Sequence, residues 1–263
     1  MPSREDLERI KSATVAFALI PDTPPTDPRE TPFTILGSGF CIDPSGVVVT
    51  CEHVISAFSH EDIRQAIASI PSDDRQGAVW PLRNLRVLIP HVLFFDMEDA
   101  ENLAVFPISI AQAAAKLKFD LGAAVLRPHP AFATGFPYLQ IEPFSSLYEG
   151  MDVATCGFPL GNEMQKQLGS MTSSFTRGIL SSIAPAPGTK EELVTGFQLD
   201  ITATHGNSGG PVFDWETGRV FGVLQGGPEQ SPGQVLPGIA RAEPIYRLLR
   251  DGLIERLKAA KSP

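Results

Sequence analysis

The stretch Thr204-His205-Gly206-Asn207-Ser208-Gly209-Gly210-Pro211 decides how the rest of the chain is interpreted. It places one serine among three glycines, which suits a tight turn that exposes a hydroxyl group. Such a turn also lets successive backbone N–H groups point at one spot, as the stabilisation of an oxyanion requires. The stretch therefore predicts a nucleophilic serine, Ser208.

The order of residues along the chain narrows the class of nucleophile. Gly-x-Ser-x-Gly also describes the nucleophile elbow of α/β-hydrolases, in which the catalytic histidine follows the serine. The five histidines here are His53, His60, His91, His129 and His205, and none of them follows Ser208. An α/β-hydrolase triad with Ser208 is therefore excluded, and the order His, Asp, Ser remains.

A candidate histidine and a candidate acid lie upstream at the ends of apolar runs. His53 follows Val47-Val48-Val49-Thr50-Cys51-Glu52, whereas His60, His91 and His129 lie in polar or proline-rich contexts typical of structural histidines. Asp120 precedes Leu121-Gly122-Ala123-Ala124-Val125-Leu126. A buried carboxylate there would hold the imidazole tautomer and stabilise the imidazolium.

Short apolar runs bounded by turn residues fill most of the chain, and they predict an all-β barrel or sandwich. The runs are Thr14–Ile20, Phe33–Ile42, Val47–Thr50, Leu85–Ile89, Val92–Phe95, Leu103–Ile108, Leu121–Leu126, Tyr138–Ile141, Asp152–Cys156, Gly178–Ile183, Gly196–Ile201, Arg219–Gln225 and Gly238–Arg241. Helical periodicity is confined to Arg4–Lys11, Glu61–Ile70, the alanine-rich Ile110–Lys118 and Glu243–Lys261. The apolar stripe of the last segment predicts a C-terminal helix packed on a β-domain.

Composition excludes several functions. The 263 residues carry a net charge of −9 without a Lys/Arg cluster, so we expect no nucleic-acid partner. No run approaches the roughly 20 apolar residues of a membrane helix, and the N-terminus lacks a secretory pattern, so we expect a cytoplasmic protein without a membrane partner. The wide spacing of Cys41, Cys51 and Cys156 predicts buried free thiols, and a disulfide between Cys41 and Cys51 is the alternative. We expect no cofactor and no metal.

Several motifs together resemble the trypsin-like serine peptidases, specifically the bacterial HtrA/Deg-type branch. They are Gly37-Ser38-Gly39-Phe40, Thr50 with His53-Val54, Asp120-Leu121, Cys156-Gly157-Phe158-Pro159-Leu160-Gly161, Gly178-Ile179-Leu180-Ser181-Ser182-Ile183 and Gly206-Asn207-Ser208-Gly209-Gly210-Pro211. The resemblance covers residues 13–250. About 15 residues follow the matched region, which is too few for a PDZ domain, so none is expected.

The resemblance implies two six-stranded antiparallel barrels with the site between them. It implies an N-terminal extension over residues 1–12, a first barrel over 13–133, a second barrel over 134–242, and a C-terminal helix and tail over 243–263. His53 would act as general base and acid, Asp120 would orient it, and Ser208 would attack a peptide bond to form an acyl-enzyme. The N–H groups of Gly206 and Ser208 would form the oxyanion hole.

The resemblance also implies a specificity pocket, with protein or peptide substrates. Its walls would be Thr202, Ala203, Val223, Leu224, Gln225 and Gly226. None of these residues is an acid, so the pocket is expected to accept small or medium apolar side chains; Asp200 is the one nearby acid that would overturn this. A catalytically silent binding module and an esterase or acyl transferase on the same triad are the alternatives.

Overall fold

A computed structural model describes residues 2–21, 33–57, 88–96, 104–161, 172–227, 229–231, 234–235, 237–250 and 252–260. The predicted helix Glu61–Ile70 lies outside these residues. No helix within the described ranges is long and apolar enough to cross a bilayer.

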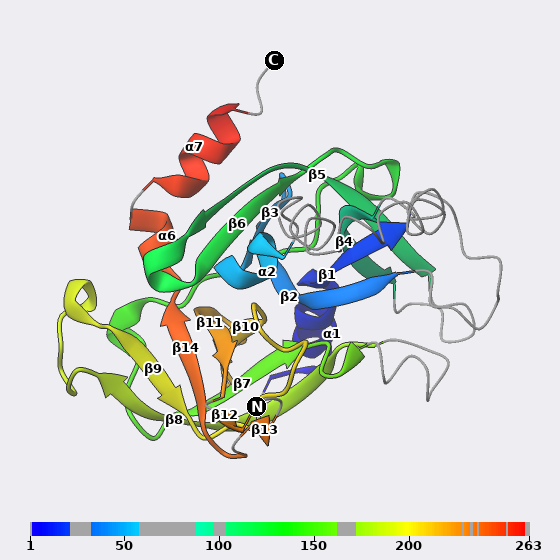
Figure 1. The fold of residues 1–263 in the computed structure, drawn as a ribbon. Coiled ribbons are helices and arrows are strands. Elements are labelled where there is room, and N and C mark those ends of the chain that lie inside the picture. The colour runs from blue at the N-terminus through cyan, green and yellow to red at the C-terminus, as the bar shows by residue number, and fades with distance from the viewer. Residues whose placement is uncertain are drawn as a thin grey trace, which may run out of the picture.

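Two closed antiparallel barrels of six strands each make up the fold, so the predicted fold class is confirmed (Figure 1). The first barrel has the strand order β1-β2-β3-β6-β5-β4. Its strands are β1 (Thr14–Pro21), β2 (Thr34–Asp43), β3 (Val47–Thr50), β4 (Leu88–Asp96), β5 (Ala104–Lys116) and β6 (Leu121–Leu126).

The second barrel has the order β10-β11-β14-β9-β8-β7. Its strands are β7 (Asp152–Gly157), β8 (Ser174–Ala184), β9 (Gly196–Leu199), β10 (Pro211–Asp214), β11 (Val220–Gly226) and β14 (Ala240–Pro244), and β12 (Glu229–Ser231) and β13 (Gln234–Val235) form a separate hairpin. The predicted division at residues 133 and 134 falls between the two sets of strands and stays a prediction.

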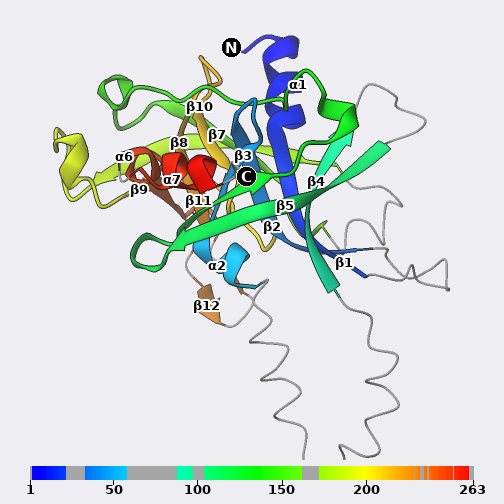
Figure 2. The ribbon, with the colours of Figure 1, turned by 90° about the horizontal axis from the view of Figure 1, so that it is seen from above.

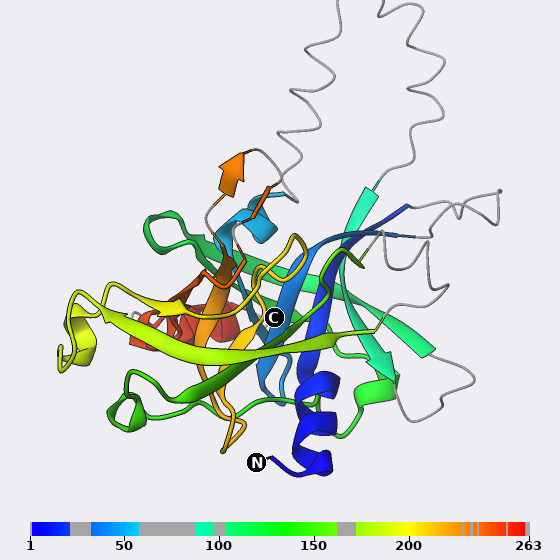
Figure 3. The ribbon, with the colours of Figure 1, turned by 90° about the horizontal axis from the view of Figure 1, so that it is seen from below.

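Helices lie at the periphery of the barrels. The helix α1 (Arg4–Ala13) begins at a capping box, in which Ser3 and Asp6 each accept the backbone N–H of the other. The short helix α2 (Glu52–Ser56) follows β3, and Figures 2 and 3 show α1 and α2 on opposite sides of the molecule. Single 3-10 turns occur at η1 (Leu117–Phe119), η2 (Pro130–Phe132), η3 (Phe144–Ser146) and η4 (Glu191–Leu193).

The predicted helix over Ile110–Lys118 is wrong, because this segment belongs mostly to β5. Its alanines pair with β6, in the register Ala113 to Ala124 and Ala115 to Gly122, and this pairing closes the barrel between β3 and β4. Backbone hydrogen bonds to a neighbouring strand outweigh the high helix propensity of alanine here. Only the last residues of the segment, Leu117–Phe119, form a 3-10 turn.

The predicted C-terminal helix Glu243–Lys261 is partly wrong. Glu243 and Pro244 end strand β14, and the helical residues divide into α6 (Tyr246–Arg250) and α7 (Leu253–Ala260) around Gly252, whose φ is 62°. The expected packing does occur: Leu253, Ile254 and Leu257 join the core of the first barrel. The chain thus returns from the second barrel to the first, where α7 contacts β5 and β6.

Candidate active site

His53 and Asp120 form a close pair in the first barrel. The imidazole Nδ1 lies 2.9 Å from both carboxylate oxygens of Asp120, and the backbone N–H of His53 donates to Oδ1 at 3.0 Å. His53 is held at the second position of α2, whose start follows the buried end of β3. Asp120 stands between η1 and β6 with φ 48°, in the left-handed region that aspartate tolerates better than most residues. The acid is therefore aimed at the histidine by an unusual backbone conformation.

The pair shifts the titration of both groups. The hydrogen bond that Asp120 accepts from His53 raises the pKa of His53 above its ordinary value, and this outweighs the opposing effect of partial burial. Burial by itself disfavours ionised Asp120, but the hydrogen bonds and charge of His53 together hold the pKa of that carboxyl below its usual value. The arrangement therefore favours ionised Asp120 and stabilises a protonated imidazole.

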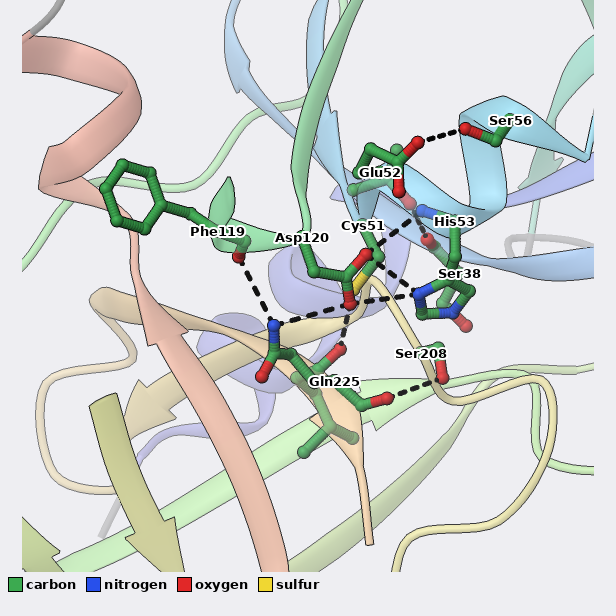
Figure 4. A network of polar contacts seen from close by, with 11 residues as sticks. Ser38, Cys51, Glu52, His53, Ser56, Phe119, Asp120, Ser208 and Gln225 are labelled. Carbon is green, nitrogen blue, oxygen red and sulfur yellow. Dashed lines mark hydrogen bonds and ion pairs between the residues drawn. The ribbon is translucent and has the colours of Figure 1, made fainter. Parts of the chain in front are cut away.

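Ser208 lies beside this pair on the turn before β10. Its hydroxyl donates to the backbone carbonyl of Gln225 at 2.9 Å, and its own carbonyl accepts from Ser38 N–H at 2.8 Å. Figure 4 shows Ser208 next to the imidazole ring of His53, with the hydroxyl turned to the Gln225 carbonyl. A hydrogen bond to the imidazole would require a rotation of this hydroxyl, and catalytic hydrogen bonds often tighten only when a ligand binds.

Two glycines give the turn around Ser208 its shape. Gly206 and Gly209 have φ values of 92° and 89°. A Cβ on Gly206 would lie 2.2 Å from the carbonyl oxygen of Phe158, and one on Gly209 would lie 2.1 Å from that of Ser38. Only glycine fits at either position, because both the conformation and the space exclude a side chain.

The backbone of this turn leaves two donors unused. The N–H groups of Asn207, Gly209 and Gly210 donate to protein carbonyls, whereas those of Gly206 and Ser208 have no acceptor among the described residues. The carbonyl of His205 accepts from Leu160 N–H at 2.7 Å. Because a trans peptide points its C=O and N–H in opposite directions, this bond turns the Gly206 N–H away from Leu160. The turn can thus present two donors to an anion.

Two residues that support the site were not predicted in that role. Ser38 donates its hydroxyl to the carbonyl of Gly206 at 2.6 Å and accepts Phe158 N–H at 3.0 Å, which ties the serine turn to the first barrel. Gln225 donates through Nε2 to Oδ2 of Asp120 and to the carbonyl of Phe119, both at 3.3 Å. The sequence signal for Ser38 is its place between Gly37 and Gly39, since a serine between two glycines indicates close backbone contact.

The predicted pocket residues lie in different environments. Ala203, Val223 and Leu224 are fully buried in the packing of the barrels, whereas Thr202 is exposed and accepts Gly238 N–H at 3.3 Å. The Gln225 side chain is directed at Asp120, and Gly226 has φ 121° close to the Ser208 hydroxyl. Asp200 is exposed beside Gly238. The pocket itself stays a prediction.

All three cysteines are buried free thiols, so the bridge between Cys41 and Cys51 is not formed. Cys41 donates to the carbonyl of Asp43 and Cys51 to that of Leu224, which directs the two thiols to different partners. Burial raises the pKa of Cys41 to about 12. Burial and the nearby charge of Asp120 also raise the pKa of Cys51 well above its usual value.

One cluster in the described part of the chain could offer three ligand atoms to a metal, namely Cys51, His53 and Asp120. The carboxylate of Asp120 is already occupied by His53, and a thiol that keeps its proton is a poor ligand. We therefore expect neither dithiothreitol nor EDTA to change the peptidase activity that the sequence resemblance implies, measured as initial rates before and after dialysis. Loss of activity that Zn²⁺ restores would contradict this expectation, and loss in dithiothreitol alone would implicate a disulfide.

Comparison with known proteins places the chain in a family. Residues 37–223, more than half of the chain, match the family model described as a trypsin-like peptidase domain. The chain belongs to the trypsin-like peptidases. No curated protein matches this trypsin-like peptidase.

Solved structures share the trypsin-like fold at low sequence identity. The chain matches the HtrA-type protease AlgW with a decapeptide at 15% identity and a TM-score of 0.58, over 96% of this chain and 67% of that one. It matches Deg5 at 19% identity and a TM-score of 0.57, over 95% and 92% of the two chains. These matches show a common fold with HtrA-type proteases.

Proposed function

We propose that this trypsin-like peptidase is a serine endopeptidase in which Ser208 is the nucleophile, His53 the general base and acid, and Asp120 the residue that orients His53. The observation that carries the proposal is the Asp120–His53 pair, with Nδ1 2.9 Å from both carboxylate oxygens, next to a serine on a glycine turn. The family membership supports peptide bonds as substrates.

The proposed reaction follows from the positions of the protons. Asp120 accepts a hydrogen bond from the Nδ1–H of His53, and this holds the tautomer in which Nε2 can accept the Ser208 proton as Oγ attacks the substrate carbonyl. The N–H groups of Gly206 and Ser208 would donate to the oxyanion that forms. The imidazolium then protonates the leaving amine, and a water activated by His53 hydrolyses the acyl-enzyme.

The experiment that tests the proposed function is a comparison of cleavage sites in a denatured proteome digested with the wild type or with Ser208→Ala. We expect new peptide ends only with the wild type. Ends that appear equally with both proteins would contradict the proposal, since the nucleophile would then be another group.

The pH profile should report the His53–Asp120 pair. His53 accepts a proton only when it is neutral, so kcat/KM should rise with pH and reach a plateau above the pKa of His53. Because the hydrogen bond to Asp120 raises that pKa, the midpoint should lie above the ordinary histidine value of about 6.5. The measurement is kcat/KM on a peptide without titratable groups, and a flat profile from about pH 5 to about pH 8 would exclude His53 as the base.

Substrate preference should follow the absence of an acid among the proposed pocket residues. Burying an unpaired cation is costly, so we expect cleavage after Ala, Val or Leu, with discrimination of roughly 10–200-fold per methylene group. A peptide library with all residues before the scissile bond would measure this. A strong preference for Lys or Arg would refute the apolar pocket. If Asp200→Ala abolished that preference, Asp200 would be the acid that pairs with the substrate cation.

A further inference from the structure

The turn that carries Asp120 depends on contacts from outside its own strand. The residue before it, Phe119, ends η1, and its carbonyl accepts one hydrogen bond from the Gln225 side chain at 3.3 Å. The same Gln225 Nε2 reaches Asp120 Oδ2. Asp120 has φ 48°, and this angle depends on the orientation of the peptide bond that joins Asp120 to Phe119. Small displacements of Phe119 would therefore change the direction of the Asp120 carboxylate. The support of Phe119 therefore matters for the His53–Asp120 pair.

Arg247 of α6 lies over the ring of Phe119. Its guanidinium carbon is 4.2 Å from the ring centroid, nearer than the ammonium groups of Lys116 at 5.9 Å and Lys118 at 5.4 Å. Figure 4 shows the Phe119 ring pointing away from the triad towards the ribbon of α6. A planar guanidinium stacks on an aromatic face more effectively than an ammonium group. The stacking fixes the outer side of the turn.

The guanidinium is itself held in one orientation. Its Nη1 lies 2.5 Å from Oε2 of Glu243, and its Nη2 donates to the carbonyl of Val194 at 2.5 Å. The Arg247 side chain is 15% exposed and that of Glu243 is 2% exposed. Two charge-assisted hydrogen bonds in a poorly solvated place leave the guanidinium little freedom. The ring of Phe119 thus rests on a rigid group of the second barrel's C-terminal segment.

We propose that Arg247 is a positioning residue for catalysis. By stacking on Phe119, a contact called the brace below, it stabilises the left-handed turn that directs Asp120 at His53. The proposal rests on the proposed function of the triad. It makes α6 part of the catalytic support, since the segment that leaves the second barrel fixes the acid carried by the first.

Loss of the brace should act on catalysis more than on binding. In Arg247→Ala we expect kcat to fall, by up to about 100-fold for a misplaced catalytic group, while KM stays unchanged. The midpoint of the pH profile should also fall towards the ordinary histidine value, because a misdirected carboxylate raises the pKa of His53 less. The variant keeps the other titratable groups that act electrostatically on His53 or Asp120, which are Cys51, Glu52 and Glu243.

Two control variants distinguish the loss of the Arg247–Phe119 stacking from the loss of a positive charge. Arg241→Ala removes the other partner of Glu243, at 3.0 Å, but Arg241 is 64% exposed and is not stacked on Phe119. Arg250→Ala removes an exposed arginine of the same helix, paired with Glu192 at 3.3 Å. We expect normal kcat and a normal pH midpoint in both. Equal losses in Arg241→Ala and Arg247→Ala would overturn the proposal in favour of neutralisation of Glu243.

A spectroscopic readout makes the test independent of turnover. The proton on His53 Nδ1 should give a resolved downfield resonance in the wild type, which should shift or broaden in Arg247→Ala and remain in Arg250→Ala. If Arg247→Ala does not fold, Phe119→Leu removes the stacked ring with little change in volume and should give the same shift. An unchanged resonance and an unchanged kcat in Arg247→Ala would overturn the proposed role of Arg247. An inactive wild type whose resonance still changes in Arg247→Ala would overturn only the proposed function.

Discussion

Replacing Ser208 by alanine should reduce turnover of a peptide substrate by about 10⁴-fold or more, because no acyl-enzyme can form without the hydroxyl. The fold should persist, since the substitution removes only an oxygen whose hydrogen bond goes to the backbone carbonyl of Gln225. His53→Ala added to Ser208→Ala should cost little more, because the two residues act as a unit. The measurement is kcat for each variant on one fluorogenic peptide.

The matched control for this prediction is Ser56→Ala. Ser56 is an exposed serine on α2, close in sequence to His53, and its hydroxyl bonds to Glu52. Its loss should leave turnover near the wild-type value. Comparable activity in Ser208→Ala and Ser56→Ala would show that Ser208 is not the nucleophile.

Replacing Asp120 by asparagine should lower turnover by about 10⁴-fold while the protein stays folded. Asparagine has nearly the same shape and also tolerates the left-handed conformation at φ 48°. Its neutral amide neither stabilises an imidazolium nor enforces the Nδ1–H tautomer of His53. The fall should therefore appear in kcat with an unchanged melting temperature.

Asp43→Asn is the control for the loss of an acid. Asp43 pairs with Lys258 Nζ at 2.6 Å, and this partly exposed ion pair joins β2 to α7. Its removal should affect stability slightly and turnover not at all. Near-normal turnover in Asp120→Asn would mean that another acid orients His53.

The periodicity of apolar residues was sufficient to predict most strands, but not all of them. Apolar runs such as Val47–Thr50 and Leu121–Leu126 coincide with β3 and β6. β10 is absent from the predicted strands, because Pro211–Asp214 follows the serine turn directly and opens with a proline. β5 was mistaken for helix at its end, because an alanine-rich segment shows its strand character only when β6 pairs with it.

The sequence predicts those site residues whose neighbours in the chain form a recognisable pattern. Ser208, His53 and Asp120 each stand in a recognisable local context, and the structure brings His53 and Asp120 into direct contact. The contacts of Gln225 with Asp120 and of Arg247 with Phe119 join residues that are more than 100 positions apart. No pattern in a single sequence reports such contacts, since they arise only when the two barrels and α6 pack together.

Active-site labelling can show whether Ser208 is a nucleophile that His53 activates. The wild type, Ser208→Ala and His53→Ala would each be incubated with a fluorophosphonate probe, and the modified residue would be located by peptide mass spectrometry. We expect stoichiometric modification of Ser208 in the wild type, none in Ser208→Ala, and strongly slowed labelling in His53→Ala. A folded wild type that leaves Ser208 unmodified, or labels at the same rate without His53, would contradict this expectation.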